Sequence, residues 1–291
     1  MYITSYNHRE FLCEAIESVI EQSRKPDEVI IIDDCSRDGS QDMISDYQKR
    51  YPNLIKMHLN DKNGGIAQVR NIALNLFSGE ALTGLDGDDK FLPTKIEKEL
   101  NVLEDSDVDL VYSNSYWCGP DGSINHVWLE KPEIAPEGDT FLKVFGRDFP
   151  RNSLFRSEMV KASKLKTIGF YDTELPIYED WDMRIRMSKQ LKFAYCDAPL
   201  SIKRDNPEGL SKSKLSLHIQ IINYIVRKNF SLLEDVSIRE RRVVLQRIGR
   251  LLSGLASVVL RQDASHGSYA RSLKFGLWAL YYRYLYGLKS F

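Results

Sequence analysis

Apolar segments typical of β-strands alternate with amphipathic segments typical of α-helices four times over about the first ninety residues. The predicted strands are 29–32, 55–59 and 82–86, preceded by an apolar run within residues 1–7 that is too short for a complete buried strand. The predicted helices lie between Asn7 and Pro26 and over 41–51, 66–77 and 93–103. Such alternation produces βαβ units, which pair into a parallel sheet through right-handed crossovers. The predicted fold class is therefore α/β, with these residues forming half of a nucleotide-binding fold.

Local signals set the limits of these elements. Asn7, with Glu10 three residues later, predicts an N-cap with a capping box, and Pro26 stops the helix that follows. Residues 29–32 are continuously apolar, which is typical of a strand buried on both faces of a parallel sheet. Gly79 is predicted to be the C-cap of the helix over 66–77.

The second part of the chain changes character after the helix at 93–103. The predicted elements are a strand at 108–114, a hairpin turn at 119–122, its return strand at 124–129, a helix at 140–145, a strand at 152–155 and a strand at 192–196. Hairpin signals predict antiparallel pairing here, so we expect a mixed sheet. Pro199 is predicted to end the body of this sheet.

The segment 82–89 runs from an apolar strand directly into a cluster of three carboxylates. Side chains in a strand alternate with period two, so Asp86 and Asp88 lie on the same side and can converge on one cation. Oxygen ligands favour a hard metal, Mg²⁺ or Mn²⁺. The alternative is a solvated turn before a helix that begins at Pro93. An EF-hand loop is excluded, because Lys90 stands where a ligand oxygen is needed.

Composition and the absence of common motifs narrow the function. No G-x-G-x-x-G and no G-x-x-x-x-G-K-[ST] follows a predicted strand, which argues against a dinucleotide-dependent dehydrogenase and a P-loop NTPase. The net charge of −1 over 291 residues gives no general attraction to nucleic acid. Four scattered cysteines without a C-x-x-C pair favour a reducing compartment, so we expect a cytoplasmic protein.

The C-terminal region is basic and aromatic. Residues 237–291 carry ten Lys or Arg against two acidic residues, a net charge of +8, which leaves −9 on the preceding residues. Apolar residues recur at helical spacing over 243–259, and an aromatic run covers 278–286. This region is either a helical hairpin packed on itself and on the catalytic body, or a surface for anionic lipid headgroups. No signal peptide and no run of 18 uncharged apolar residues is present.

A second acidic group opens a predicted helix near residue 179. Glu179, Asp180 and Asp182 precede apolar residues at helical spacing, and Trp181 is interpreted as a packing residue of that helix. Acids in a first turn also offset the helix dipole, by about 0.3–1 kcal/mol for each charge. The sequence alone leaves both a structural and a catalytic role open for Asp180.

These segments, in this order, resemble the family-two, GT-A-fold nucleotide-sugar glycosyltransferases of bacterial type. The resemblance covers roughly residues 1–205 and rests on five motifs: Ile3-Thr4-Ser5-Tyr6-Asn7, Ile32-Asp33-Asp34-x-Ser36-x-Asp38-Gly39-Ser40, Asn63-Gly64-Gly65 with Arg70-Asn71, Asp86-x-Asp88-Asp89, and Glu179-Asp180-Trp181. Each motif falls at the end of a predicted strand or the start of a predicted helix, so independent levels of the sequence agree. The resemblance implies a GT-A catalytic domain over 1–205 and a helical appendage over 206–291.

The resemblance also implies roles for individual residues. Thr4 and Tyr6 would line the base pocket, Asp34 would accept a hydrogen bond from the nucleobase, and Arg70 would lie near the base or diphosphate. Asp88 would bind Mn²⁺ or Mg²⁺ most directly, while Asp86 would reach the ribose, or the metal through water. Asp180 would be the general base, with Glu179 and Asp182 supporting it.

The implied reaction is the inverting transfer of a sugar from a nucleotide-diphosphate donor, a UDP-sugar, to a hydroxyl of a glycan or lipid-linked acceptor. We expect it to serve cell-surface polysaccharide synthesis in the cytoplasm, with peripheral membrane contact through 237–291. One alternative is a sugar nucleotidyltransferase, although the usual Gly-rich basic loop is missing after the first strand. The other is a degenerate, non-catalytic nucleotide-binding module.

Two departures from the family pattern are visible. The family's first strand is longer, whereas Met1 lies inside the Thr-x-Tyr-Asn segment, which indicates a truncated or misassigned start. A histidine that often completes the metal shell is absent from 202–206, and Asp205 or His218 are the substitutes that the sequence offers.

Overall fold

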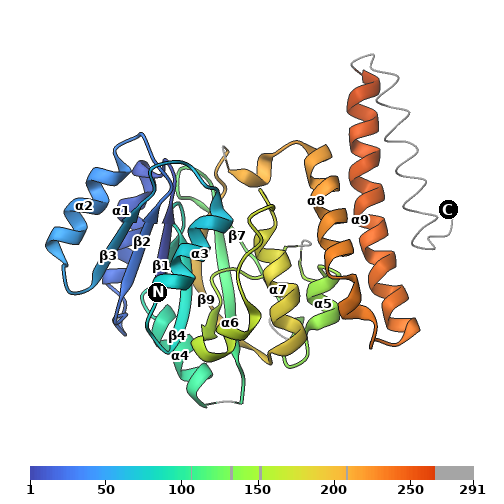
Figure 1. Ribbon diagram of the computed structural model, residues 1–291, viewed down its shortest axis with the longest axis horizontal. Helices are drawn as coiled ribbons and strands as arrows, with labels where there is room; N and C mark the ends of the chain where they lie inside the picture. Colours follow the sequence, from blue (N-terminus) through green and yellow to red (C-terminus); the bar gives the residue numbers. More distant parts are fainter. Residues whose placement is uncertain (106, 132–133, 151–152, 208, 266–291) are drawn as a thin grey trace. The chain divides into compact units, whose positions relative to one another are not determined.

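The computed structural model describes residues 1–105, 107–131, 134–150, 153–207 and 209–265 (Figure 1). The chain divides into two compact units. The first unit is Met1–Thr140 with Ser153–Pro207, and the second is Phe141–Asn152 with Glu208–Phe291. The predicted aromatic run at 278–286 lies outside the described residues.

The first unit is built on a mixed sheet in the order β3-β2-β1-β4-β8-β6-β9-β5, with β7 paired to β6. Its strands are β1 (Tyr2–Ser5), β2 (Val29–Asp33), β3 (Ile55–Leu59), β4 (Ala81–Asp86), β5 (Lys90–Phe91), β6 (Leu110–Cys118), β7 (Ile124–Val127), β8 (Met159–Lys161) and β9 (Phe193–Arg204). Strands β1 to β4 pair in parallel, and β8 joins them to the second half by antiparallel pairing. The predicted parallel half and mixed second half are confirmed.

Helices cover this sheet in the first unit (Figure 1). They are α1 (Arg9–Ile20), α2 (Ser40–Arg50), α3 (Ile66–Leu76), α4 (Lys95–Asp105), α6 (Ala162–Ile168) and α7 (Glu179–Gln190). One core cluster joins α1, α2 and α4 to alternate strand residues such as Ile3, Ile31 and Leu85. Because neighbours in a strand point to opposite faces, the residues between them face the other way, where α3 packs against β1 and β2. The sheet is thus buried on both faces.

The parallel strands end together at one edge of the sheet. Thr4 pairs with both Ile32 and Asp86, and Ser5 pairs with Asp33, so the acidic ends of β2 and β4 flank the end of β1. Ligands of open α/β sheets bind outside the carboxyl ends of the strands. This register therefore brings the motifs that contain Thr4, Asp33 and Asp86 together at one edge of the sheet.

Four local predictions are wrong. The N-cap position of α1 is His8 rather than Asn7, and the C-cap of α3 is Phe77, two residues before Gly79. No strand forms over 153–155, the described part of the predicted strand, and β8 lies at Met159–Lys161 instead. Strand β9 continues through Pro199, because a register shift beside Asn114 of β6 accommodates the proline.

The described part of the second unit is helical. It contains α5 (Phe141–Phe145), α8 (Leu215–Lys228) and α9 (Ile238–Ser265), and α9 contacts both other helices. The helical spacing predicted over 243–259 is confirmed by α9. Within the described residues, Ile238–Arg261 is the one stretch long and apolar enough to cross a membrane, a test that a buried helix of a soluble protein also passes.

Candidate active site

Asp86, the last residue of β4, is bound by two other motifs. Its Oδ1 accepts hydrogen bonds from the Thr4 hydroxyl and from Arg70 Nη2, both at 3.1 Å. Burial would raise the pKa of Asp86, but Arg70, and after it Lys203 and Arg156, hold the pKa well below its usual value. Asp86 is therefore an ionised carboxylate held in a fixed position.

Arg70 joins the end of β4 to the start of α7. Its Nη1 donates to Glu179 Oε1 at 2.7 Å while Nη2 holds Asp86, and its guanidinium lies 5.7 Å from the centre of the Tyr171 ring. Burial raises the pKa of Glu179 to about 7 against the opposing charge of Arg70, and the charge of Asp180 adds to the rise. Arg70 thus connects the two acidic groups that the sequence singled out.

Asp180, the second residue of α7, is neutralised by two arginines. Its Oδ2 accepts hydrogen bonds from Arg156 at 2.9 Å and from Arg184, one helical turn later. Arg184 is itself held by both oxygens of Glu158, at 3.0 and 2.7 Å. Burial opposes ionisation of Asp180, but Arg184 and then Arg156 keep its pKa far below the usual value. Asp180 therefore stays ionised at neutral pH.

Asp88 differs from Asp86 and Asp180, because its carboxylate is not bound by an arginine of the described chain. Its Oδ2 accepts a 3.2 Å hydrogen bond from the Asn206 amide and lies 3.9 Å from His8 Nε2. The Asp88 and His8 side chains are 15% and 19% exposed. Asp88 therefore has an amide donor and an imidazole beside its carboxylate, and no Lys or Arg among the described residues forms an ion pair with it.

Asp89, the third acid of the cluster, points into the protein. It binds Lys203 at 3.0 Å and accepts a hydrogen bond from the Arg204 amide. Burial raises the pKa of Asp89 to about 6 against the charge of Lys203. Asp89 therefore anchors β9 and does not join the other two acids.

Asp34 holds the loop before α3. Its oxygens accept hydrogen bonds from the Asn60 amide and from the backbone amides of Gly64 and Gly65, at 2.7 to 2.9 Å. The side chain is buried. The predicted contact to a nucleobase remains a prediction, and the structure adds a role in fixing the loop that would border the base.

Tyr6 is the exposed aromatic residue of the first motif, with 46% of its surface accessible. The neighbouring Asn7 adopts a left-handed backbone (φ 54°) and accepts a hydrogen bond from the Arg37 amide. Asn tolerates this conformation better than most residues. The turn therefore presents the Tyr6 ring to solvent, where a base can stack on it.

The residues present fit a divalent ion that takes part of its shell from a ligand. No three His, Cys, Asp or Glu side chains among the described residues converge closely enough to hold an ion by themselves. Mg²⁺ and similar ions are often bound by one or two carboxylates plus substrate phosphates and water. Asp88 is a partly exposed carboxylate, and Nε2 of the His8 ring lies 3.9 Å from its Oδ2. This donor set suits such a shared site.

The two substitutes proposed for the missing histidine lie in different settings. The ring of His218, in α8, bonds the Ser213 carbonyl at 3.1 Å within the second unit. The backbone amide of Asp205 donates to the Cys118 carbonyl at the end of β9. Neither contact involves Asp88.

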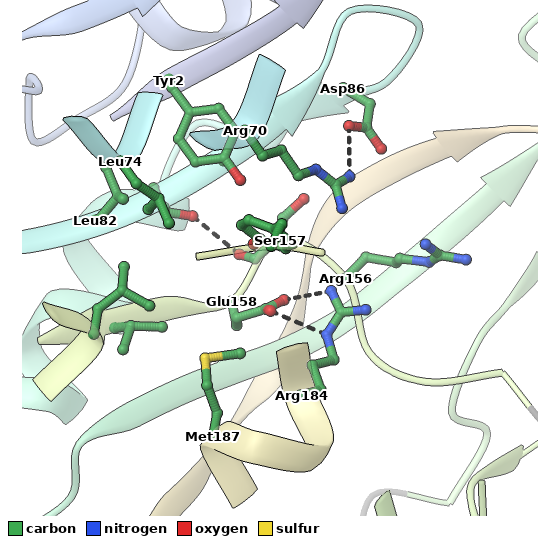
Figure 2. Close-up of a pocket in the computed structure, with 15 residues that line it drawn as sticks. Tyr2, Arg70, Leu74, Leu82, Asp86, Arg156, Ser157, Glu158, Arg184 and Met187 are labelled. Carbon is green, nitrogen blue, oxygen red and sulfur yellow. Dashed lines mark hydrogen bonds and ion pairs between the residues drawn. The ribbon is translucent and has the colours of Figure 1, made fainter. Parts of the chain in front are cut away.

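A small cavity lies among the ion pairs of the first unit (Figure 2). Tyr2, Arg70, Asp86, Glu158 and Arg184 are among the residues that line it. Its volume of about 40 Å³ has room for water molecules, whereas small-molecule pockets occupy roughly 300–1,000 Å³. This cavity belongs to the support of the carboxylates and is too small for a sugar nucleotide.

Several residues of the site were missed by reading the sequence. Arg184 carries the one usable signal, because it lies four residues after Asp180 and such pairs face each other on a helix. The sequence gives no such signal for Arg156, Glu158 and Lys203, because they reach the acidic residues of the site only in the folded protein.

The family model for glycosyl transferase family 2 matches residues 1–162, which is more than half of the chain. The chain therefore belongs to glycosyl transferase family 2. The predicted family and the α/β, GT-A-like fold with a C-terminal helical region are confirmed.

Two relatives illustrate the sequence similarity. TuaG of Bacillus subtilis, a glycosyltransferase assigned to teichuronic acid biosynthesis, is 33% identical over 135 residues, covering 46% of this chain and 53% of TuaG. WfaP of Escherichia coli, named a UDP-Glc:α-D-GlcNAc-diphosphoundecaprenol β-1,3-glucosyltransferase, is 34% identical over 132 residues, covering 45% of this chain and 51% of WfaP. The chain spans about half the length of these relatives.

Solved structures share the fold. TarS of S. aureus in complex with UDP-GlcNAc superposes with a TM-score of 0.61 at 16% identity, covering 94% of this chain and 88% of TarS. The mannosyltransferase PcManGT of Pyrobaculum calidifontis, in complex with GDP-Man and Mn²⁺, gives 0.59 at 15% identity, covering 99% and 82%. At these identities the likeness concerns the fold alone.

Proposed function

We propose that the protein is an inverting, metal-dependent glycosyltransferase. It moves a sugar from a UDP-sugar to a hydroxyl of a glycan or lipid-linked acceptor in cell-surface polysaccharide synthesis. One observation carries this proposal: Arg70 binds Asp86 at the end of β4 and Glu179 at the start of α7, next to Asp180. This link supports a single site in which Asp86 serves the donor and Asp180 the acceptor.

On the donor side, the chain binds and orients the nucleotide. Tyr6 stacks on the base, Thr4 and the Asp34 loop border it, and Asp86, fixed by Arg70, faces the ribose. A divalent ion, Mn²⁺ or Mg²⁺, held by Asp88 would offset the negative charge that develops on the departing diphosphate. The Mn²⁺ in the PcManGT complex supports this choice of ion.

On the acceptor side, Asp180 accepts the proton that the attacking hydroxyl loses. Arg184 and Arg156 keep Asp180 without a proton before the reaction, and the same two ion pairs lower the basicity of its carboxylate. A hydroxyl that attacks opposite the leaving diphosphate inverts the anomeric configuration, so an α-linked donor gives a β product. Glu179 and Asp182 support the start of α7.

We further propose that residues 1–205 form the catalytic domain and residues 206–291 a separate appendage at the cytoplasmic face of the membrane. The compact units divide near this boundary. Exposed Ile238 and Val243 occur among the arginines of α9, a combination that suits an interface with anionic headgroups. The lipid-linked acceptor in the name of WfaP supports an acceptor of that class.

A donor panel tests the proposal. The protein is incubated with UDP- and GDP-sugars and a synthetic lipid-diphosphate-linked sugar, with and without Mn²⁺, while nucleoside diphosphate release is measured and the product's anomeric configuration is determined by NMR. We expect Mn²⁺-dependent UDP release and a β-linked product from an α-linked donor. Pyrophosphate exchange would support a sugar nucleotidyltransferase, and binding of UDP without turnover of any donor would support a non-catalytic module.

A further inference from the structure

His8 occupies the turn between β1 and α1, and its ring has no evident structural role there. It stands at the N-cap position of α1, but its side chain makes no capping hydrogen bond. Its Nδ1 is buried without a hydrogen-bond partner among the described atoms. Buried polar atoms are normally hydrogen-bonded, so an orphaned ring nitrogen requires an explanation.

The other ring nitrogen faces Asp88. His8 Nε2 lies 3.9 Å from Asp88 Oδ2, which is too long for a hydrogen bond. Two ligands that each lie about 2.1 Å from one octahedral ion are separated by roughly 3.0 Å when adjacent and roughly 4.2 Å when opposite. The observed distance of 3.9 Å lies between these two values, so rotation of the two side chains would bring both atoms to one ion.

Gly87 leaves room for the ring. A Cβ atom at this position would lie 2.9 Å from His8 Nδ1 and 2.7 Å from the Thr4 carbonyl. Any side chain between Asp86 and Asp88 would therefore displace the imidazole. The absence of a side chain at residue 87 brings His8 and Asp88 together.

We propose that His8, through Nε2, is a ligand of the divalent ion together with Asp88. This inference rests on the proposed metal-dependent function and assigns a residue to it. Two protein ligands, with phosphate oxygens and water completing the shell, also agree with the lack of a three-residue cluster among the described side chains.

A nitrogen ligand changes the choice of metal. Mg²⁺ takes oxygen ligands, whereas imidazole is a ligand of transition metals. His8 therefore favours Mn²⁺ over Mg²⁺. Removing its ring should reduce the difference in affinity between Mn²⁺ and Mg²⁺.

Pulsed electron paramagnetic resonance of Mn²⁺ with UDP tests the assignment, because a directly bound imidazole gives ¹⁴N modulation and a bound diphosphate gives ³¹P coupling. The samples are wild type, His8→Ala, His8→Asn and the control His58→Ala, which removes a histidine of β3. We expect ¹⁴N modulation in wild type and His58→Ala and its loss in both His8 variants, with ³¹P coupling kept in all. We also expect His8→Ala to weaken Mn²⁺ binding in the presence of UDP by roughly 10-fold or more.

The outcomes separate the inference from the proposed function. Mn²⁺ with ³¹P coupling but no ¹⁴N modulation in wild type, or ¹⁴N modulation that persists in His8→Asn, would overturn the role of His8 and leave metal dependence standing. Absence of Mn²⁺ binding in wild type with UDP would overturn both.

Discussion

The two ends of the candidate site bury their key acids to the same degree but neutralise them differently. The Asp88 and Asp180 side chains are 15% and 13% exposed. Asp180 binds two arginines, whereas Asp88 faces an amide donor and a histidine 3.9 Å away. The chain therefore supplies the counter-charge of Asp180 itself, whereas no Lys or Arg among the described residues forms an ion pair with Asp88.

This difference supports the proposal that Asp88 and Asp180, which look alike in the sequence, have different tasks. An acid compensated by rigid, buried arginines is fixed in position and in charge. An acid without a full counter-charge attracts a cation, because an unpaired carboxylate near low-dielectric surroundings is unfavourable.

Asp180→Asn is expected to lower kcat by roughly 10²–10⁴-fold, the usual range for a lost general base. Glu179→Gln is the matched control, because it removes the neighbouring acid of the same helical turn. If Asp180 only offsets the helix dipole, kcat will stay near wild type and the free energy of unfolding will fall by about 1 kcal/mol or less. A larger loss of kcat in Glu179→Gln would transfer the role of base to Glu179, whose pKa of about 7 suits it.

Arg184→Met is expected to lower the free energy of unfolding by about 3–5 kcal/mol, because it leaves Asp180 and Glu158 partly unpaired in a buried site. Denaturant unfolding followed by circular dichroism measures this loss. Adding Glu158→Gln to Arg184→Met should recover part of it, since the second change removes one of the orphaned charges. An unchanged midpoint in Arg184→Met would show that the pair does not stabilise the fold.

Asp88→Asn is expected to remove the Mn²⁺-dependent part of UDP affinity, a loss of roughly 10–100-fold. Calorimetric titrations with Mn²⁺ and with EDTA separate this part from direct nucleotide binding. In EDTA the variant should equal wild type. Unchanged affinity in Mn²⁺ would remove Asp88 from the metal site.

Glu179 should make the protein less stable as pH rises, whereas Asp180, whose pKa is lowered, makes it more stable as pH rises. Its pKa is raised from 4.5 to about 7 on folding, so the folded state binds the proton more tightly and loses stability as pH rises through this window. The free energy of unfolding of wild type relative to Glu179→Gln should therefore fall between about pH 4.5 and about pH 7. A difference that stays constant over this range would contradict the raised pKa.

The sequence predicted the parallel half of the fold well, because its signals are local. The apolar run at 29–32, the helical spacing after His8 and the acids that follow β4 all reflect periodicity or burial. Strand β8 escaped prediction because it is three residues long and depends on pairing with β4 and β6.

The partners of the acids were harder to predict than the acids. Pairs such as Arg70 with Glu179 and Arg184 with Glu158 are separated by 109 and 26 residues and form only after the sheet assembles. A left-handed residue at Asn7 directs the start of α1 in a way that propensity alone does not predict. Charge patterns therefore identified candidates, while tertiary contacts assigned their environments.

We propose that donor binding depends on Asp88 and acceptor activation on Asp180. Measuring the Kd of UDP in Mn²⁺ and kcat on the same preparations of Asp88→Asn and Asp180→Asn tests it most directly. We predict that Asp180→Asn lowers kcat and leaves the Kd of UDP at the wild-type value. Asp88→Asn should lower kcat and also raise the Kd of UDP. Equal weakening of UDP binding in the two variants would contradict the claim.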